Sequence, residues 1–321
     1  MDFLSALRDG CLGFDASERG RVLVSGPDAA AFLHRLSTQH VADLPTGAGR
    51  LNAFVSAKGR MVDLVHHAVV DDGIVLLGSR GRGPVLREWL DRYLFSEKVE
   101  LFDKSHDGRV IELFGARAPD VVKRLLHAPA PAEPWSLARG ANFCVVRTFD
   151  RIAAPGEHVP AFLVWTLDGV VDLDGVSVIE RDVEDALRIA AGIPGPDGEL
   201  TDAHNPLDLG LHDAIHWAKG CYIGQEVIAR LDTYQKQSKR LVTLTLDVTT
   251  GAAVGDVVVV GGEAVGRLTS VAPVPLASLG AALAVARLSP PSEGVFVGVE
   301  HGEQALPAQA YLPETAQAAH G

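Results

Sequence analysis

The sequence predicts a multidomain α+β protein, in which a duplicated α+β body is followed by a small C-terminal antiparallel β-barrel. Its 321 residues exceed the roughly 250 to 300 residues at which one hydrophobic core usually stops growing. A pattern of strand, glycine and amphipathic helix occurs twice, and after Arg240 short β-branched runs alternate with glycine and proline. We therefore expect one α+β repeat over residues 1–109, a second over 110–239 and the barrel over 240–321.

The first copy of the pattern lies in residues 21–37. A short apolar strand ends at Gly26, and the residues after it recur at helical spacing. Further apolar, β-branched runs over 51–70 and 74–77 predict strands. A helix is expected from Pro84, because proline is tolerated in the first turn of a helix.

The second copy begins at Val110 and again reads as strand, glycine and amphipathic helix. Gly115 occupies the place of Gly26, and Leu125 that of Leu36. Two copies indicate a duplicated unit, because a solenoid normally needs at least ~3 repeats.

The rest of the body is predicted to contain strands over 143–178 and a helix over 181–191. Residues 192–206 are rich in glycine, proline and polar side chains, which is typical of a long loop that carries function. The last domain boundary is expected near Lys239, and the tail after Pro313 is expected to fray.

Composition excludes several classes of protein. The net charge of −12 disfavours a general nucleic-acid or anionic-membrane surface. The three cysteines, Cys11, Cys144 and Cys221, have none of the short spacings of a zinc or cluster site, which favours a reduced intracellular setting. The N-terminus lacks the pattern of a secretory signal, and no apolar run approaches the ~20 residues that cross a bilayer. We expect a soluble, cytoplasmic protein with no membrane partner.

The segment AKGCYIGQEVIAR, residues 218–230, concentrates the residues that suit chemistry. Lys219 lies two residues before Cys221, and a nearby ammonium favours the thiolate, which is the reactive form of cysteine. The alternative for Cys221 is a buried structural thiol, which is the interpretation we give to Cys11 and Cys144. Glu226 and Arg230, at i and i+4, can be explained as a helix-stabilising pair. That explanation does not account for Tyr222 and Gln225, whose side chains suit hydrogen bonding to a ligand.

KGCY, any residue, then GQE resembles the signature of the YgfZ family. These are folate-binding proteins of iron–sulfur enzyme maintenance, related to the glycine-cleavage T-protein (GcvT, aminomethyltransferase). The resemblance extends from about Arg21 to the C-terminal β-rich segment. It implies the T-protein-like folate-binding fold, tetrahydrofolate as ligand, and iron–sulfur client or assembly proteins as partners, including enzymes that support tRNA modification.

A second segment, SAKGRMVDL at residues 56–64, resembles the T-protein segment that holds a catalytic pair of aspartates. Asp63 matches the first aspartate, and Leu64 replaces the second. The alternative for Asp63 is a solvent-facing strand residue. Lys58 and Arg60 could meet the acidic glutamyl end of a folate.

A departure from the T-protein pattern lies at Ala190. Where that family has LEAG, with a glutamate suited to bidentate hydrogen bonding with a pterin ring, this chain has IAAG. Alanine cannot accept those hydrogen bonds, and an unpaired buried donor costs about 1 to 3 kcal/mol. Asp208, in NPLDLGL, is the acid that could substitute. The complete set of expected folate-binding residues is Lys58, Asp63, Asp208, Tyr222, Gln225, Glu226 and Arg230.

The segment HDAIH, residues 212–216, is a candidate metal site because its histidines have the i, i+4 spacing of the zinc-protease HExxH motif. The shorter Asp213 replaces the glutamate, and no third ligand is assigned. By resemblance these residues form an extended strand, in which His212 and His216 lie too far apart for one ion. We expect no tightly bound metal.

Three hypotheses for function follow. The first is a tetrahydrofolate-binding accessory protein that assembles or repairs iron–sulfur clusters, with Cys221 as working thiol, Lys219 favouring its thiolate and folate in a central cavity near Asp63. The second is a tetrahydrofolate-dependent aminomethyl or one-carbon transferase, in which Asp63 stabilises developing positive charge. The third is an interaction module without a ligand.

Overall fold

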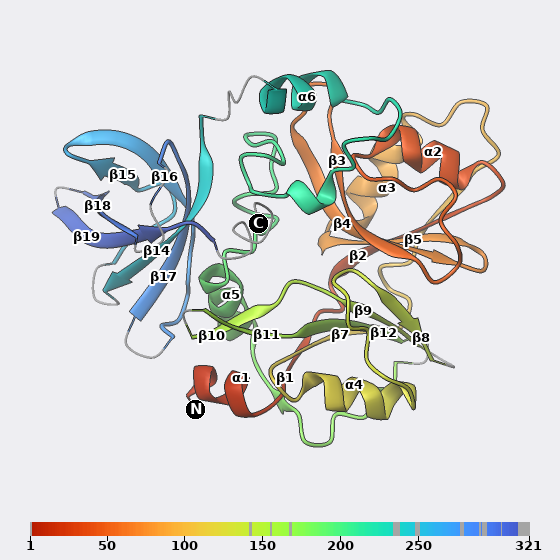
Figure 1. Ribbon diagram of the computed structural model, residues 1–321, viewed down its shortest axis with the longest axis horizontal. Helices are drawn as coiled ribbons and strands as arrows, with labels where there is room; N and C mark the ends of the chain where they lie inside the picture. Colours follow the sequence, from red (N-terminus) through yellow and green to blue (C-terminus); the bar gives the residue numbers. More distant parts are fainter. Residues whose placement is uncertain are drawn as a thin grey trace.

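The computed structural model describes residues 2–140, 143–154, 156–166, 169–233, 238–247, 251–276, 279–288, 290, 294–302 and 304–313. Two mixed α/β units lie against each other, and a barrel stands to one side of them (Figure 1). This architecture confirms the predicted fold class. The expected fraying after Pro313 falls outside the described residues.

The first unit is a five-stranded sheet in the order β3-β4-β5-β2-β6, packed with two helices. Its strands follow one another along the sequence without interruption by the other units. The elements are β2 (Arg19–Ser25), α2 (Ala29–Leu36), β3 (Gly49–Val55), β4 (Met61–Val70), β5 (Gly73–Arg80), α3 (Gly83–Asp91) and β6 (Glu100–Asp103).

The second unit is a six-stranded sheet in the order β13-β1-β7-β12-β9-β8, accompanied by a two-stranded ribbon of β10 and β11. The N-terminal strand β1 lies between β13 and β7, so the start of the chain completes a sheet made mainly of later residues. The elements are α1 (Phe3–Asp9), β1 (Leu12–Asp15), β7 (Arg109–Phe114), α4 (Ala118–Leu126), β8 (Leu137–Arg139), β9 (Phe143–Arg147), β10 (Arg151–Ala154), β11 (Glu157–Val159), β12 (Ala161–Thr166), β13 (Ser177–Val178) and α5 (Arg181–Ala190).

The duplication is visible at two equivalent glycines. Gly26 connects β2 to α2 and Gly115 connects β7 to α4, with left-handed φ angles of 103° and 126°. A β-carbon would lie 2.2 Å from the carbonyl oxygen of Lys98 in the first case and 2.5 Å from that of Gly10 in the second. Both turns therefore require glycine, for the backbone angle and for the close approach of a second segment.

The C-terminal unit is a closed barrel in the order β14-β17-β16-β15-β18-β19. Val242, Leu244 and Leu246 alternate along β14 into its buried interior. The strands are β14 (Arg240–Asp247), β15 (Val257–Val260), β16 (Glu263–Val271), β17 (Leu279–Ala286), β18 (Val295–His301) and β19 (Gln304–Tyr311).

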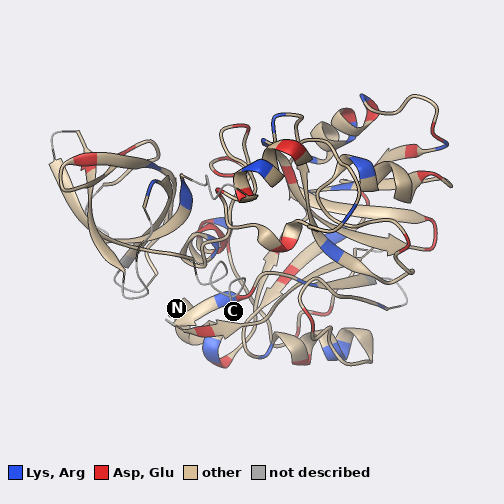
Figure 2. Cartoon of the chain, turned by 45° about the horizontal axis from the view of Figure 1, so that its top comes forward, with Lys and Arg blue, Asp and Glu red and all other residues tan. Residues whose placement is uncertain are grey.

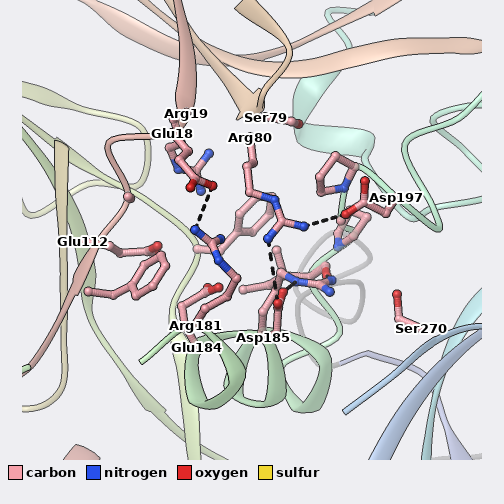
Figure 3. Close-up of a pocket in the computed structure, with 18 of the residues that line it drawn as sticks. Glu18, Arg19, Ser79, Arg80, Glu112, Arg181, Glu184, Asp185, Asp197 and Ser270 are labelled. Carbon is pink, nitrogen blue, oxygen red and sulfur yellow. Dashed lines mark hydrogen bonds and ion pairs between the residues drawn. The ribbon is translucent and has the colours of Figure 1, made fainter. Parts of the chain in front are cut away.

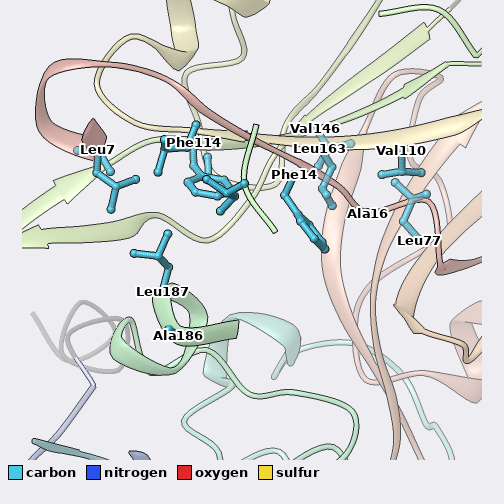
Figure 4. Packing of buried hydrophobic residues seen from close by; sticks show 14 of the residues in the cluster. Leu7, Phe14, Ala16, Leu77, Val110, Phe114, Val146, Leu163, Ala186 and Leu187 are labelled. Carbon is cyan, nitrogen blue, oxygen red and sulfur yellow. The ribbon is translucent and has the colours of Figure 1, made fainter. Parts of the chain in front are cut away.

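One buried cluster holds the units of the body together. It includes Leu77 of β5, Val110 of β7 and Leu187 of α5, so both sheets and the helix that follows them share a core (Figure 4). No helix in the described part of the chain is long and apolar enough to cross a membrane. Acidic and basic residues are interspersed along the chain in both the body and the barrel (Figure 2).

Candidate functional site

The candidate site is the turn between η1, a short 3-10 helix (His212–Ala214), and α6 (Gln225–Thr233). Cys221 is exposed, and so are residues 216–218 and 220. Lys219, which lies between them, is buried, with 8% of its surface exposed. The turn therefore presents a thiol to solvent while its neighbouring ammonium points inward.

Lys219 holds the turn against the C-terminal end of α2. Its Nζ donates to the carbonyl oxygen of His34, to that of Ser37 at 2.6 Å and to that of Gln39 at 2.8 Å. A cation is favoured there because the last carbonyls of a helix lack partners and carry the negative end of its dipole. Burial lowers the pKa of Lys219 to about 7. The three hydrogen bonds favour the charged form, because the carbonyl oxygens accept all three protons of the ammonium.

This placement gives Lys219 a structural role besides the one expected from the sequence. From the sequence, we expected the charge of Lys219 to favour the thiolate form of Cys221. Within the described residues its contacts are instead with α2 and with the ring of Tyr222, whose centroid lies 5.1 Å from Nζ. The contacts of Lys219 among the described residues do not include Cys221, and the effect of its charge on the thiol stays a prediction. Lys219 positions the turn that carries Cys221.

A second contact fixes the other end of the turn. Gly224 has a left-handed φ of 82°, and a β-carbon on it would lie 2.6 Å from the carbonyl oxygen of Ser56. Gly59 has φ of 68°, and a β-carbon on it would lie 3.2 Å from the side chain of Val227 in α6. The two segments that carry the family resemblance, residues 56–64 and 218–230, therefore pack directly on each other.

The other predicted residues of this segment lie close to Cys221 in the chain. Burial raises the pKa of Tyr222 to about 12, and its ring packs against a buried apolar cluster. Gln225 begins α6, with its backbone N–H donating to the carbonyl of Tyr222. Glu226 and Arg230 are exposed, and the described residues show no ion pair between them. The structure thus leaves their side chains available at the surface.

Asp63 lies apart from this surface, with only 1% of its area exposed. Its Oδ1 accepts the backbone N–H of Leu64 at 2.9 Å and its Oδ2 that of Ser79 at 3.2 Å. Burial raises the pKa of this carboxyl group. In the pairing of β3 with β4, Asp63 is opposite Phe54 on the face covered by α2 and α3.

Leu64 therefore points to the opposite face of β4. It is paired with Ala53, and both belong to the apolar cluster between the first sheet, α6 and the barrel. The position that the T-protein pattern gives to a second aspartate is thus part of a hydrophobic core. Asp63 is not among the residues that line either of the two cavities described below.

Asp208 and Lys58, the remaining acid and lysine of the expected folate-binding set, differ in their surroundings. The Oδ2 of Asp208 accepts the backbone N–H and the side-chain amide of Asn205, at 3.2 and 2.7 Å. Arg60 approaches the same oxygen at 4.0 Å. Asp208 is buried, which raises its pKa, and Lys58 is exposed. Asp208 therefore stabilises the loop in which it lies, through its hydrogen bonds with Asn205.

A polar cavity of about 110 Å³ lies where the two sheets, α5 and the loop after α5 meet (Figure 3). Ser79, whose N–H binds Asp63, is in its wall. Its charged lining residues come from distant parts of the chain, so no sequence motif marks them as one site; they are Glu18, Arg19, Arg80, Glu112, Arg151, Arg181, Glu184, Asp185, Arg188 and Asp197.

Much of that charge is compensated within the cavity wall. Arg151, which is 3% exposed, contacts Glu112 at 2.6 Å and Glu184 at 3.2 Å. Arg80 contacts Asp197 at 2.6 Å. Small-molecule sites usually measure ~300 to 1,000 Å³. This cavity is therefore too small for a complete folate.

A larger cavity of about 690 Å³ lies between the barrel and the second unit. Ala190 is in its body wall, together with apolar residues of β10, whereas the barrel wall carries Thr243, Thr245 and Tyr311. The volume suits a folate-sized ligand, and the hydroxyl groups can hydrogen-bond to it. The carboxylate that the T-protein pattern places at residue 190 is missing, so bidentate recognition of a pterin by that residue does not fit.

The HDAIH segment differs from the expected extended strand. Residues 212–214 form a single 3-10 turn. The hydroxyl of Thr38 stabilises this turn by donating a hydrogen bond to the carbonyl oxygen of Ala214 at 2.5 Å. The resemblance of a short sequence segment could not predict this contact, because Thr38 is distant from Ala214 in the chain. Within the described residues, no group of three histidine, cysteine or acidic side chains could hold a metal ion.

Comparison with known proteins gives consistent matches. Residues 4–149 match the family described as the GCVT N-terminal domain. A chloroplastic protein of Arabidopsis thaliana, provisionally named a transferase, is 30% identical over 280 residues, which are 83% of this chain and 63% of that protein. The aminomethyltransferase of Symbiobacterium thermophilum is 28% identical over 283 residues, covering 83% of this chain and 75% of the enzyme.

The fold itself matches a solved structure. Glycine cleavage system aminomethyltransferase T from Bartonella henselae superimposes with a TM-score of 0.78 and 17% identity, over 97% of this chain and 88% of that one. Residues 4–149 therefore match the GCVT N-terminal domain, and the chain as a whole has the fold of an aminomethyltransferase of the glycine cleavage system.

Proposed function

We propose that this chain is a YgfZ-like, tetrahydrofolate-binding accessory protein, which presents Cys221 to iron–sulfur enzymes or their assembly proteins in the cytoplasm. The observation that carries the proposal is the exposed thiol on a turn anchored at both ends, by Lys219 and by Gly224. A thiol held in this way is accessible to a macromolecule without any rearrangement of the chain.

The other two cysteines do not offer such a group. Cys11 is 3% exposed, and burial raises the pKa of its thiol to about 12. Cys144 is partly buried on β9, and burial raises its pKa as well. Iron–sulfur clusters are usually held by four cysteine thiolates. One exposed thiol suits contact with a cluster or thiol whose other ligands belong to a partner.

Similarity to aminomethyltransferases supports tetrahydrofolate as the ligand class, and the 690 Å³ cavity has room for it. The hydroxyl groups of Thr243, Thr245 and Tyr311 would orient a ligand from the barrel side. Folate bound there would stabilise the contact between barrel and body, because it would touch both walls.

Two measurements test the proposal. Cells that depend on the Cys221→Ala variant should lose activity of iron–sulfur enzymes while the variant accumulates normally; unchanged activity would exclude Cys221 as the working thiol. Calorimetric titration of the purified chain with tetrahydrofolate should show saturable binding. A parallel titration of Asp63→Ala separates a site near Asp63 from one in the larger cavity.

A tetrahydrofolate-dependent aminomethyl or one-carbon transferase is the second candidate, favoured by the names of the relatives. Asp63 would stabilise positive charge on the folate nitrogen, but its carboxylate is enclosed by two backbone N–H groups and Leu64 lies in the core. Formation of methylene-tetrahydrofolate from an aminomethyl donor, lost in Asp63→Ala, would establish this activity in place of the first.

A further inference from the structure

The wall of the 110 Å³ polar cavity contains a buried group of charges that lacks one positive charge. Glu112 and Glu184, which are 2% and 8% exposed, both line this cavity (Figure 3). Both contact the same nitrogen of Arg151, so two carboxylates share one guanidinium. Burial and the nearby charge of Glu112 raise the pKa of Glu184, as expected where a negative charge lacks a counterion.

The second oxygen of each carboxylate makes no hydrogen bond. Arg151 donates to Oε1 of Glu112 and to Oε1 of Glu184. Among the described residues, no hydrogen bond reaches Oε2 of either side chain. Buried carboxylate oxygens are normally hydrogen-bonded, because an uncompensated buried charge is costly. This wall therefore offers two acceptors to an occupant of the cavity and favours a positively charged one.

The wall formed by the first sheet offers the opposite charge. Arg19 of β2 is paired with Arg80 of β5, and both line the cavity. Arg80 contacts Asp197 at 2.6 Å. Arg19 has no ion pair among the described residues, and its guanidinium donates to the carbonyl of Gly78 at 3.2 Å. One guanidinium of this wall is thus available to a carboxylate, which is the partner that its geometry suits best.

The size of the cavity restricts the occupant to a small molecule. Its volume is about four times the ~30 Å³ that a water molecule takes up in the liquid. The side chains of Glu18 and Asp197 in its wall are 66% and 79% exposed, so the cavity can be reached from solvent. A metal ion is a poorer explanation, because the described residues include no group of three histidine, cysteine or acidic side chains that could hold one.

We propose that this cavity binds a small α-amino acid, with its ammonium group on Glu112 and Glu184 and its carboxylate on Arg19. The ammonium donates to the two Oε2 atoms and supplies the missing positive charge. The carboxylate accepts hydrogen bonds from the guanidinium of Arg19. A molecule with only one of these two groups satisfies only one wall. This site depends neither on Cys221 nor on folate binding.

Calorimetric titration of the purified full chain tests the site, with L-alanine as the probe. L-alanine should bind saturably. Acetate and methylammonium, which each lack one charged group, and L-phenylalanine, which is too large, should bind at least ~10-fold more weakly. Glu184→Gln and Arg19→Gln should each weaken the binding of L-alanine at least ~10-fold. Arg117→Gln is the matched control, because Arg117 is exposed and lies outside the cavity wall.

The Tm of the unliganded Glu184→Gln variant separates lost binding from misfolding. This substitution leaves Arg151 with one carboxylate, so the Tm should equal or exceed that of the wild type. A lower Tm would show that the chain itself compensates both carboxylates, and would overturn the proposal. Absence of L-alanine binding up to ~20 mM would also overturn it. Equal affinities for methylammonium and L-alanine, or unchanged affinity in Arg19→Gln, would replace it with a site for a cation alone.

Discussion

The ammonium nitrogen of Lys219 lies 2.6 Å from the carbonyl oxygen of Ser37, a residue 182 positions earlier in the chain. This contact ties the turn of the second repeat to the end of a helix in the first. The position of Cys221 in space is therefore determined by the packing of the two repeats and by α2, as well as by its own segment.

Lys219→Met should lower the free energy of unfolding by ~2 to 4 kcal/mol, because hydrogen bonds from a charged group are lost and buried carbonyls are left without a donor. Urea denaturation measures the change. Lys58→Met is the matched control, since Lys58 is exposed, and should change stability by less than ~0.5 kcal/mol. Equal effects of the two substitutions would contradict the anchoring role.

Gly224→Ala should destabilise the protein by ~1 to 3 kcal/mol, because alanine is strained at its left-handed φ and its β-carbon meets the carbonyl of Ser56. The matched substitution Gly220→Ala should instead stabilise by about 0.4 to 1 kcal/mol. Thermal unfolding of both variants provides the comparison. A loss of stability in the second variant would show that Gly220 has an internal role.

His66 should make the protein sensitive to mild acid. Its side chain is 5% exposed, with Nε2 2.8 Å from the carbonyl of Trp135, and burial lowers its pKa from 6.5 to about 4. The unfolded chain gains a proton below pH 6.5 and the folded chain only near pH 4. The contribution of neutral His66 to the free energy of unfolding is therefore fully present above pH 6.5. It falls by about 3 kcal/mol as the pH drops to 4.

His66→Gln removes this titration and leaves a side-chain amide that can bond to Trp135. Its free energy of unfolding, measured by urea titration at several pH values, should fall less steeply between pH 6.5 and 4 than that of the wild type. Parallel curves for the two proteins would mean that His66 does not contribute to the acid response.

Ala190→Glu should restore the acid that the T-protein pattern has at this position and tighten tetrahydrofolate binding at least ~10-fold, if the larger cavity takes the pterin ring. The same change should cost ~1 to 3 kcal/mol of stability without ligand, because it places a carboxylate against apolar neighbours. Calorimetry measures the affinity, and Ala190→Leu controls for lost volume. Unaltered affinity in Ala190→Glu would place the pterin elsewhere.

Local pattern was enough to predict most of the fold. The strand, glycine and helix around Gly26 recur around Gly115, and the change of composition after Lys239 coincides with the start of β14 at Arg240. These features depend on residues close together in sequence, where turn chemistry and periodicity are informative.

The site could be predicted only in part, because its geometry depends on distant contacts. The exposure of Cys221 agrees with its glycine-rich surroundings. The partner of Lys219, however, comes from the first repeat, and Arg151 meets Glu112 and Glu184 from separate elements. The spacing of residues in the sequence does not predict contacts between such distant side chains. The 3-10 turn at residues 212–214 was missed for the same reason, since Thr38 holds it.

The position of β1 has a consequence for synthesis on the ribosome. Residues 12–15 pair with β7 and with β13, whose residues 177 and 178 are translated much later. The first sheet, from β2 to β6, can be complete once residue 103 has emerged, whereas the second must wait with its earliest strand unpaired. Strand β1 must therefore stay available while the whole of the first sheet is made, and the second sheet is finished only after residue 178 has emerged.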